Sequence, residues 1–247
     1  MKESSPAKSA RSAHGTTHTR VYTELKSALM NGDFVPGQRL VVRQLAERLE
    51  TSPMPVREAL RRLVSDEALF DHPNKGVIVP DATVEVISDL VRVRSSIEGA
   101  AAEWAATTIL PDELDAIIGL NDAMKECAAK GKTANYLVLN RQFHFAIYRA
   151  ARSAVLQPVI ERLWLRAGPW LNIMRGEATL GQGLDHHEEI LEGLRTADGP
   201  MARRALVADI ADAADIMLRA ASGSPIVSKT ERVGAAPRRF ASAAGAR

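Results

Sequence analysis

The chain has 247 residues, of which 46% are hydrophobic and 25% are charged, with a formal net charge of +2. This length is sufficient for two domains with separate cores. The single cysteine, Cys127, excludes an intramolecular disulfide and a multi-cysteine zinc site. The sequence has no apolar run of about 20 residues and no signal-peptide core, so we expect a cytoplasmic protein with no membrane partner.

The charge is unevenly divided along the chain. Residues 1–80 carry 12 basic and 9 acidic side chains, and residues 222–247 carry 5 and 1. Residues 81–221 carry 15 basic and 20 acidic side chains. Basic ends around an acidic middle favour a polyanionic partner for the first part of the chain.

The first expected elements are a disordered arm and a helix. Residues 1–18 are rich in Ser, Thr, Ala and Lys and show no periodicity, so we expect them to be disordered. A helix is expected from about Thr19 to Met30, because Asn31 and Gly32 are typical of a helix end.

The most specific pattern is VVRQLAERLETSPMPVREALRRLVSD, residues 41–66. Its apolar residues recur with helical spacing in two groups, separated by Thr51, Ser52 and Pro53. A hydroxyl N-cap followed by a proline indicates that a second helix begins at about Ser52. Two short helices around a tight turn form a helix-turn-helix, whose second helix is suited to the major groove of DNA.

Two short β-type runs follow, residues 68–70 and 77–79, and the turn sequence DHPNKG lies between them. They predict a hairpin with Lys75 and Gly76 at its tip, which completes a winged-helix domain over residues 19–80. Lys75 either contacts a phosphate or the minor groove, or is a solvated loop lysine.

Strand patterns are lacking from Ala82 onward, so we expect an all-helical domain over residues 82–221. Proline and glycine at the breaks delimit about six helices. These helices are expected at Thr83 to Thr108, Pro111 to Lys130, Thr133 to Arg152, Val155 to Gly176, Thr179 to Ala197 and Gly199 to Ala221. Residues 222–247 are expected to be a disordered basic tail.

Several polar residues of the helical domain border apolar stripes. His187 is followed by apolar residues at i+3, i+4 and i+7 and is expected to point inward, whereas His186 faces a more polar side. Asn140 and His144 are four residues apart on one helix, and Asp209 lies in line with apolar residues of the last helix. Each is more often a hydrogen-bonded core residue than a ligand, but several converging inside a bundle can form a metal site.

Arg94 also lies on an apolar face, which is unusual for a cation unless it is paired. An i, i+4 ion pair with Glu98 is the simplest explanation.

The segment PGQRLVVRQLAERLETSPMPVREALRRLVSDEALF, followed by PNKGVIV, resembles the winged-helix signature of GntR-type bacterial transcription regulators. Residues 20 to 221 resemble the FadR-like branch, which has an all-helical FCD effector domain. The resemblance implies a mostly α fold, with DNA contacts from the helix-turn-helix and the wing. The candidate DNA-binding residues are Arg43, Ser52, Met54, Arg57, Arg61, Lys75 and Gly76.

Two positions depart from the family pattern. Pro53 stands where the family commonly has an arginine, so one DNA contact is expected to be missing. Glu50 replaces the usual glycine before the turn and is expected to tighten or redirect it.

The resemblance also implies a metal site. Metal-binding members have an Asp four residues before a first His, a second His before Ile-Leu, and a third His on the last helix. This chain has NRQFH from Asn140 to His144, HEEIL beginning at His187, and Asp209 near the third position. The candidate ligands are therefore Asn140, His144, His187 and Asp209, an N/O set suited to Zn, Ni or Mn.

The family members are ligand-responsive regulators, typically dimers and often repressors that bind palindromic operators. An arginine at the position of Arg94 often lines their effector cavity, where a guanidinium suits a carboxylate. The resemblance thus implies operator DNA and a small organic acid as partners and a homodimer as the assembly. The candidate effector-binding residues are Arg94, Glu98, Tyr148 and Trp164.

Two other functions remain open from the sequence. Asp185, His186 and His187 look like the DHH motif of some metal-dependent phosphoesterases, although those enzymes need an α/β scaffold. A non-specific DNA-binding scaffold protein would use only the basic ends, and the inward His187 and Arg94 argue against it.

Overall fold

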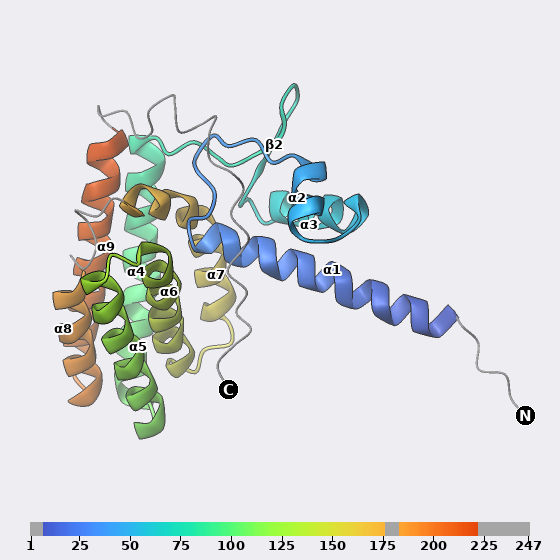
Figure 1. The fold of residues 1–247 in the computed structure, drawn as a ribbon. Helices are drawn as coiled ribbons and strands as arrows, with labels where there is room; N and C mark the ends of the chain where they lie inside the picture. The colour runs from blue at the N-terminus through green and yellow to red at the C-terminus, as the bar shows by residue number, and fades with distance from the viewer. Residues whose placement is uncertain (1–6, 176–182, 222–247) are drawn as a thin grey trace, which may run out of the picture.

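The structure, a computed structural model, describes residues 7–175 and 183–221 (Figure 1). Most of these residues are helical, and the two strands among them form one antiparallel hairpin. The predicted fold class, a winged helix-turn-helix followed by an all-helical bundle, is confirmed. No described helix is long and apolar enough to cross a membrane.

The first unit consists of three helices and a hairpin. The elements are α1 (Ala7–Met30), α2 (Val42–Arg48), α3 (Pro53–Ser65), β1 (Phe70–His72) and β2 (Gly76–Ile78). Helix α3 buries the apolar face that its sequence spacing predicts, with Val56, Leu60 and Leu63 at most 1% exposed. This face packs against α1, so the opposite face of α3 is left to solvent.

Helix α1 begins at Ala7, well before the expected start at about Thr19, and the predicted disordered arm of residues 1–18 is wrong from Ala7 onward. The error arose because the segment lacks apolar periodicity. Its alanine, lysine and arginine residues nevertheless have high intrinsic helix propensity. Residues 1–6 of the predicted arm lie outside the described residues.

The turn between α2 and α3 has the predicted position and N-cap residue but lacks the side-chain capping hydrogen bond. Ser52 is the N-cap and Pro53 the first helical residue, yet the Ser52 side chain accepts no capping hydrogen bond. Glu50 has a φ of 49°, in the left-handed region that favours glycine. The departure at Glu50 therefore places a non-glycine residue in a conformation that costs backbone energy.

The hairpin pairs Phe70 with Ile78 and His72 with Gly76. On its other edge, Val79 N–H donates to the Gln38 carbonyl at 2.9 Å. Gly76 begins β2 with a φ of 67°, and Lys75 lies in the turn directly before it. Strand β2 is thus bonded on both sides, and the turn of the wing projects away from α2 and α3 (Figure 1).

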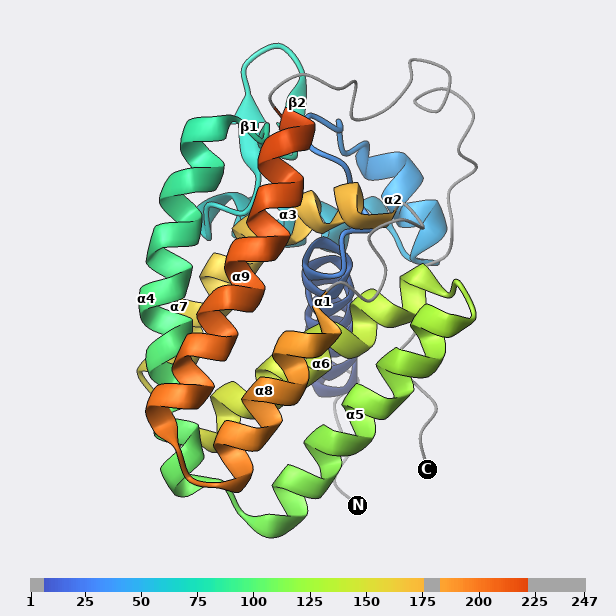
Figure 2. The same ribbon diagram turned by 90° about the vertical axis from the view of Figure 1, so that its left-hand side faces the viewer.

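The second unit is a helical bundle in which α4 and α9 pack along each other (Figure 2). Its elements are α4 (Val84–Thr108), α5 (Pro111–Ala129), α6 (Thr133–Ala150), α7 (Leu156–Ala167), the 3-10 helix η1 (Gly168–Arg175), α8 (Leu184–Arg195) and α9 (Gly199–Ala221). Gly99 favours the close approach of α4 and α9, since a Cβ there would lie 3.0 Å from the Val207 side chain, a tight contact.

One expected helix is divided in two. The helix predicted from Val155 to Gly176 is α7 followed by η1, because Pro169 cannot donate the backbone hydrogen bond that would continue α7. The helix expected from Thr179 is α8, which begins at Leu184. Residues 176–182 and the predicted tail, 222–247, lie outside the described residues.

The two units contact each other through the end of α1. A Cβ at Gly168 would lie 2.3 Å from the Leu29 carbonyl oxygen, so only glycine permits this approach of η1 to α1. Asn172 donates to the Gly32 carbonyl at 2.7 Å, and Arg141 Nε donates to Asn31 Oδ1 at 2.7 Å. The bundle is therefore bonded directly to the first unit.

Candidate functional site

The exposed face of α3 carries the predicted DNA-binding side chains. Met54 is 59% exposed, and Arg57 and Arg61 are exposed one and two turns further along. Ser52 is exposed at the start of the helix. Because α1 covers the opposite face, these residues are the part of α3 that can enter a DNA groove.

Arg43 and the wing add basic groups beside α3. The Arg43 side chain is 88% exposed and pairs only at 3.3 Å with Glu47 on the same helix. Lys75 and Gly76 are exposed at the wing. In Figure 1 the wing lies next to α2 and α3, so a bound duplex could contact all three elements.

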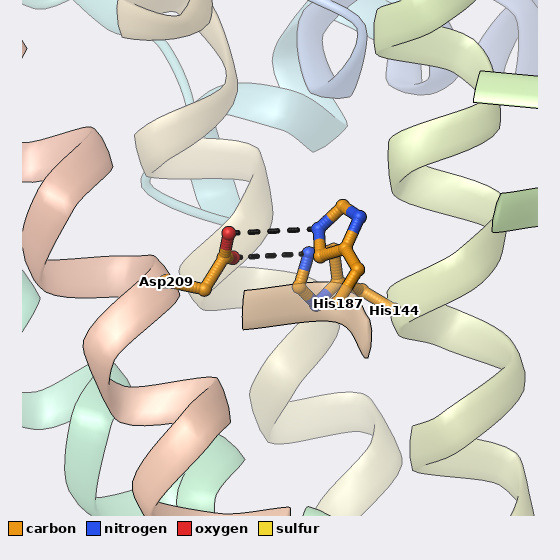
Figure 3. A group of neighbouring side chains, drawn as sticks. All are labelled: His144, His187 and Asp209. Carbon is orange, nitrogen blue, oxygen red and sulfur yellow. Dashed lines mark ion pairs between the residues drawn. The ribbon is translucent and has the colours of Figure 1, made fainter. Parts of the chain in front are cut away.

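Inside the bundle, three helices bring His144, His187 and Asp209 together (Figure 3). His144 comes from α6, His187 from α8 and Asp209 from α9. Asp209 Oδ2 lies 3.3 Å from His144 Nε2, and Asp209 Oδ1 lies 3.5 Å from His187 Nε2. One ligand atom from each residue lies within 4.8 Å of the others.

This geometry fits a divalent metal ion. Ligand bonds of about 2.1 Å around zinc put neighbouring ligand atoms roughly 3.4 Å apart in a tetrahedral site. Both ring nitrogens of His187 are buried without a hydrogen-bond partner, and the ring is stacked on Phe143 with centroids 4.4 Å apart. An orphaned imidazole nitrogen facing a carboxylate is an arrangement that a cation would satisfy.

The carboxylate of the group is held in its ionised form. Burial acts to raise the pKa of Asp209, but the adjacent imidazoles of His144 and His187 outweigh it and hold that pKa well below its usual range. Asp209 is therefore an anion at any physiological pH. A carboxylate that remains ionised when buried is suited to a metal ligand.

The backbone at Gly183 closes one side of the group. A Cβ at this position would lie 2.6 Å from Asp209 Oδ1, much closer than real Cβ contacts. Gly183 is also the N-cap of α8, with an ordinary φ of −85°. Its requirement for glycine therefore comes from the carboxylate and not from backbone conformation.

Asn140, the fourth predicted ligand, is half-buried one turn before His144 on α6. Tyr136, another turn earlier, is 6% exposed. Burial, followed by the negative charge of Asp209, raises the pKa of Tyr136, so the phenol stays neutral. Tyr136, Asn140, His144 and Tyr148 thus continue one i, i+4 row along the helix.

A second buried group adjoins the first and is centred on Glu98, which is 0% exposed. Arg94 donates to Glu98 through Nε at 2.6 Å and through a terminal nitrogen at 3.2 Å. The Tyr148 hydroxyl and the Trp164 indole also donate to Glu98, at 2.5 and 3.0 Å. All four predicted effector residues are therefore in one hydrogen-bonded network.

The residues of this network have different roles. Glu98 accepts four hydrogen bonds, so its carboxylate orients the other three side chains. Burial acts to lower the pKa of Arg94, but the attraction of Glu98 exceeds it and the pKa is raised, which keeps the guanidinium charged. Tyr148 also lies 3.4 Å from His144 Nδ1 and joins the two groups.

The structure brings the predicted residues His144, His187 and Asp209 together, and the sequence analysis did not include the residues that pack around them. In the sequence, Gly183 is indistinguishable from an ordinary loop glycine, and no local pattern connects it to Asp209. Tyr136 could have been found, because its spacing from Asn140 and His144 repeats the helical period. Phe143, which stacks on His187, reads as a plain core aromatic.

The DHH segment is not arranged as a phosphoesterase site. His186 Nε2 lies 2.9 Å from Asp212 Oδ2 at the bundle surface, away from the inward His187. The described segments provide only the wing strands and no strand beside this motif. The α/β scaffold that the hydrolase alternative requires is therefore lacking in this part of the chain.

Both units of the chain match families of known bacterial regulatory proteins. Residues 17–79 match the model of the bacterial regulatory proteins of the gntR family, and residues 89–212 match the FCD domain. The HTH-type transcriptional regulator McbR of Escherichia coli (strain K12) is 32% identical over 78% of this chain and 89% of its own length. The galactonate operon transcriptional repressor of the same strain is 25% identical over 78% of this chain and 93% of its own.

A solved structure shows the same arrangement. The structure of E. coli McbR/YncC has a TM-score of 0.77 and 30% sequence identity, and it covers 82% of this chain and 97% of its own.

Proposed function

Since the chain belongs to the GntR family of transcriptional regulators and carries an FCD domain, we propose that it represses transcription as an operator-bound dimer that responds to a small organic acid. Members of this family are regulators and not enzymes, so neither the hydrolase nor the scaffold alternative is supported. The observation that carries the proposed response is on α6. This one helix holds His144 of the buried group and Arg141, which is bonded to Asn31 of the first unit.

DNA would be read by α3 and the wing. Arg57 and Arg61 are exposed on α3, and an arginine can donate to a guanine edge or to phosphates. Arg43 and Lys75 would contribute backbone contacts, which fix register without reading sequence. The relative named as a galactonate operon repressor favours repression as the direction of control.

The effector chemistry follows from the charges of the buried groups. Arg94 and Glu98 neutralise each other, and Asp209 adds one negative charge. The net negative charge of these buried residues would repel an organic acid unless a cation were also bound. His144, His187 and Asp209, with Asn140 beside them, would hold a divalent metal such as Zn, Ni or Mn.

A bound metal would supply positive charge for a carboxylate. The N–H groups of Arg94 that Glu98 does not use would receive the same anion, since a guanidinium suits a carboxylate. Tyr148 and Trp164 are already held by Glu98 and would lie beside the bound acid. An acid bound here would contact side chains of α6 and α7 directly.

The route to the DNA-binding unit is short. Arg141 follows Asn140 on α6 and is bonded to Asn31 at the end of α1. On α7, Glu161 lies three residues before Trp164 and pairs with Lys26 of α1 at 2.5 Å. Movement of α6 or α7 on effector binding would therefore shift α1, which packs on α3.

The DNA-binding part is tested with palindromic sites from the promoter region upstream of the protein's own gene. We expect salt-sensitive binding measured by fluorescence anisotropy. Arg57→Ala should weaken operator binding by about 1–3 kcal/mol. Arg195→Ala, at an exposed position of α8, should leave operator binding unchanged. Lack of salt-sensitive binding to every palindromic site in that region would contradict the proposal.

The metal part is tested by elemental analysis of the purified protein and by thermal shift of the chelated protein on adding Zn²⁺ or Ni²⁺. His187→Gln should abolish the shift. His186→Gln is the matched control, because His186 is next to His187 in the sequence but its ring pairs with Asp212, outside the group of His144, His187 and Asp209. A metal-free protein with no shift would remove the metal from the proposal and leave operator binding to be judged separately.

A further inference from the structure

The first turns of α1 project beyond the other elements of the DNA-binding unit. Among the side chains that the structure describes, Val21 is the first of this helix to be buried. Figure 1 shows α1 running past α2 and α3 and on toward the N-terminus, away from the bundle. The turns from Ala7 to Arg20 extend over about 21 Å, at 1.5 Å per residue.

The charges of these turns are all of one sign. Their sequence, AKSARSAHGTTHTR, contains Lys8, Arg11 and Arg20 and no acidic residue. Its apolar residues are all alanines, so the segment has no apolar stripe that could pack on another helix. Lys8 and Arg11 are three residues apart and repel each other, and the sequence has no carboxylate three or four positions from either to offset this repulsion. A helix of this composition suits a polyanionic partner.

The projecting turns begin beside the DNA-reading face of α3. His18 Nδ1 pairs with Glu58 Oε2, and Glu58 follows Arg57 on the exposed side of α3. Arg20 donates to the Leu49 carbonyl at 3.2 Å, close to the turn between α2 and α3. Helix α1 therefore leaves the winged helix at the edge of the surface that would face DNA.

Lys8 and Arg11 continue the helical row to which His18 belongs. Positions 8, 11 and 18 are separated by three and then seven residues, which is the spacing of one face of an α-helix. At 1.5 Å per residue, Lys8 and Arg11 are about 15 and 11 Å beyond His18 along the helix axis. The major groove that receives a recognition helix is about 12 Å wide. These two positions therefore fall at a phosphate strand that borders the groove occupied by α3.

We propose that residues 7–20, which we call the α1 extension, are a third DNA-contacting element in which Lys8 and Arg11 bind backbone phosphates. Such contacts fix the register of a protein on the duplex and add salt-dependent affinity, but they carry no sequence information. The α1 extension thus strengthens binding to any site that α3 accepts. The inference rests on the DNA binding of the proposed function and adds contacts outside α3 and the wing.

The first test measures the operator affinity of the full chain and of the variant Lys8→Gln with Arg11→Gln over a range of salt concentrations. Glutamine removes both charges and has nearly the same helix propensity as lysine and arginine. The slope of log affinity against log salt should become shallower by about 1.8, which is about 0.9 for each lost phosphate contact. At 0.1 M salt, binding should be roughly 10- to 60-fold weaker. The preference for the operator over its single-base variants should stay the same.

The variant Lys130→Gln with Lys132→Gln is the matched control. It removes two positive charges from exposed positions between α5 and α6, so it changes the net charge equally without touching the α1 extension. Its salt slope should equal that of the wild type. An unchanged slope in the Lys8 and Arg11 variant, or an equal loss in both variants, overturns the proposal.

The second test locates the contacts by phosphate ethylation interference on the same operator. The wild type should require a set of phosphates that the Lys8 and Arg11 variant does not require, and the phosphates nearest to α3 should be required by both. An identical set for the two proteins overturns the α1 extension as a DNA contact and leaves the operator-binding regulator standing. A wild type without salt-sensitive binding to any palindromic site overturns both proposals.

Discussion

Arg94 and Glu98 form an ion pair across one turn of α4, with Nε and Oε1 2.6 Å apart, in the interior of the bundle. Their side chains are 11% and 0% exposed. Removing two charges from water is costly, and the cost is recovered only when the remaining polar atoms are also bonded. Tyr148 and Trp164 complete the bonding of Glu98, so the carboxylate holds three side chains of the buried group in place.

Glu98→Gln should destabilise the protein by about 3–5 kcal/mol, because it leaves the buried Arg94 guanidinium without an anion. Urea unfolding followed by circular dichroism measures the change. Glu126→Gln is the control, since Glu126 pairs with Lys130 at 2.9 Å on an exposed helix face, and it should have no measurable effect. Adding Arg94→Met to Glu98→Gln should recover part of the loss. An equal effect of the two glutamine variants would contradict the assigned role of Glu98.

The pairing of Arg94 with Glu98 could be predicted from the sequence because it is local. A cation on an apolar face needs an anion, and Glu98 is the residue one turn away. The inward direction of His187 follows from the same helical periodicity, as does the buried face of α3. Local spacing is sufficient wherever the contact lies on one element.

Contacts between distant segments could not be predicted in this way. Gly183 and Asp209 are brought together only by the packing of α8 on α9, and no periodicity records that approach. The early start of α1 was missed for another reason, since its first turns follow residue propensity without an apolar stripe. The family resemblance supplied the metal and effector sets, which the residues alone left as ordinary core positions.

Gly183→Ala should weaken metal binding roughly 10- to 100-fold without removing a ligand. The added methyl would lie 2.6 Å from Asp209 Oδ1 and displace the carboxylate. Calorimetric titration of the chelated protein with Zn²⁺ measures the affinity. Unchanged affinity would mean that Asp209 is not held where the site requires it.

The control for this variant is Gly119→Ala on α5. A Cβ at Gly119 has nothing within 4 Å, and the residue is exposed inside a helix. This substitution should raise the free energy of unfolding by about 0.5–1 kcal/mol, since alanine has the higher helix propensity, and should leave metal affinity unchanged.

Arg141→Ala should separate effector binding from DNA binding. It removes the 2.7 Å hydrogen bond to Asn31 Oδ1, which joins α6 to the end of α1. Effector affinity in the presence of metal should change little, because Arg141 is not one of the predicted effector residues. The change in operator affinity that the effector causes should fall by about 0.5–2 kcal/mol.

The measurement compares operator affinity with and without the acid found by a thermal-shift screen, in wild type and variant. Arg149→Ala is the control, since Arg149 is exposed on the same helix. An undiminished response in Arg141→Ala would show that the signal takes another route, such as the pair of Lys26 with Glu161.

Tyr22 links α1 to the end of α3, and its removal should change the dependence of stability on pH. The Tyr22 hydroxyl donates to Asp66 at 2.9 Å, and the Arg62 guanidinium lies 3.8 Å from the ring centroid. Burial, followed by the hydrogen bond to Asp66, raises the pKa of Tyr22 to about 12, so the protonated phenol is favoured in the folded state. Its stabilising contribution is fully present below about pH 10 and is lost as the pH rises to about 12.

Tyr22→Phe should therefore lower the free energy of unfolding by about 1 kcal/mol at pH 7, the net contribution of one hydrogen bond, while the stacking of Arg62 on the ring is kept. The difference in free energy of unfolding between wild type and variant should narrow between about pH 10 and 12. Only the wild type loses a stabilising contribution of Tyr22 in that range. Urea unfolding at pH 7, 9, 10 and 11 measures this. A difference that stays constant over that range would mean that the Tyr22 hydroxyl is not bonded to Asp66 in the folded protein.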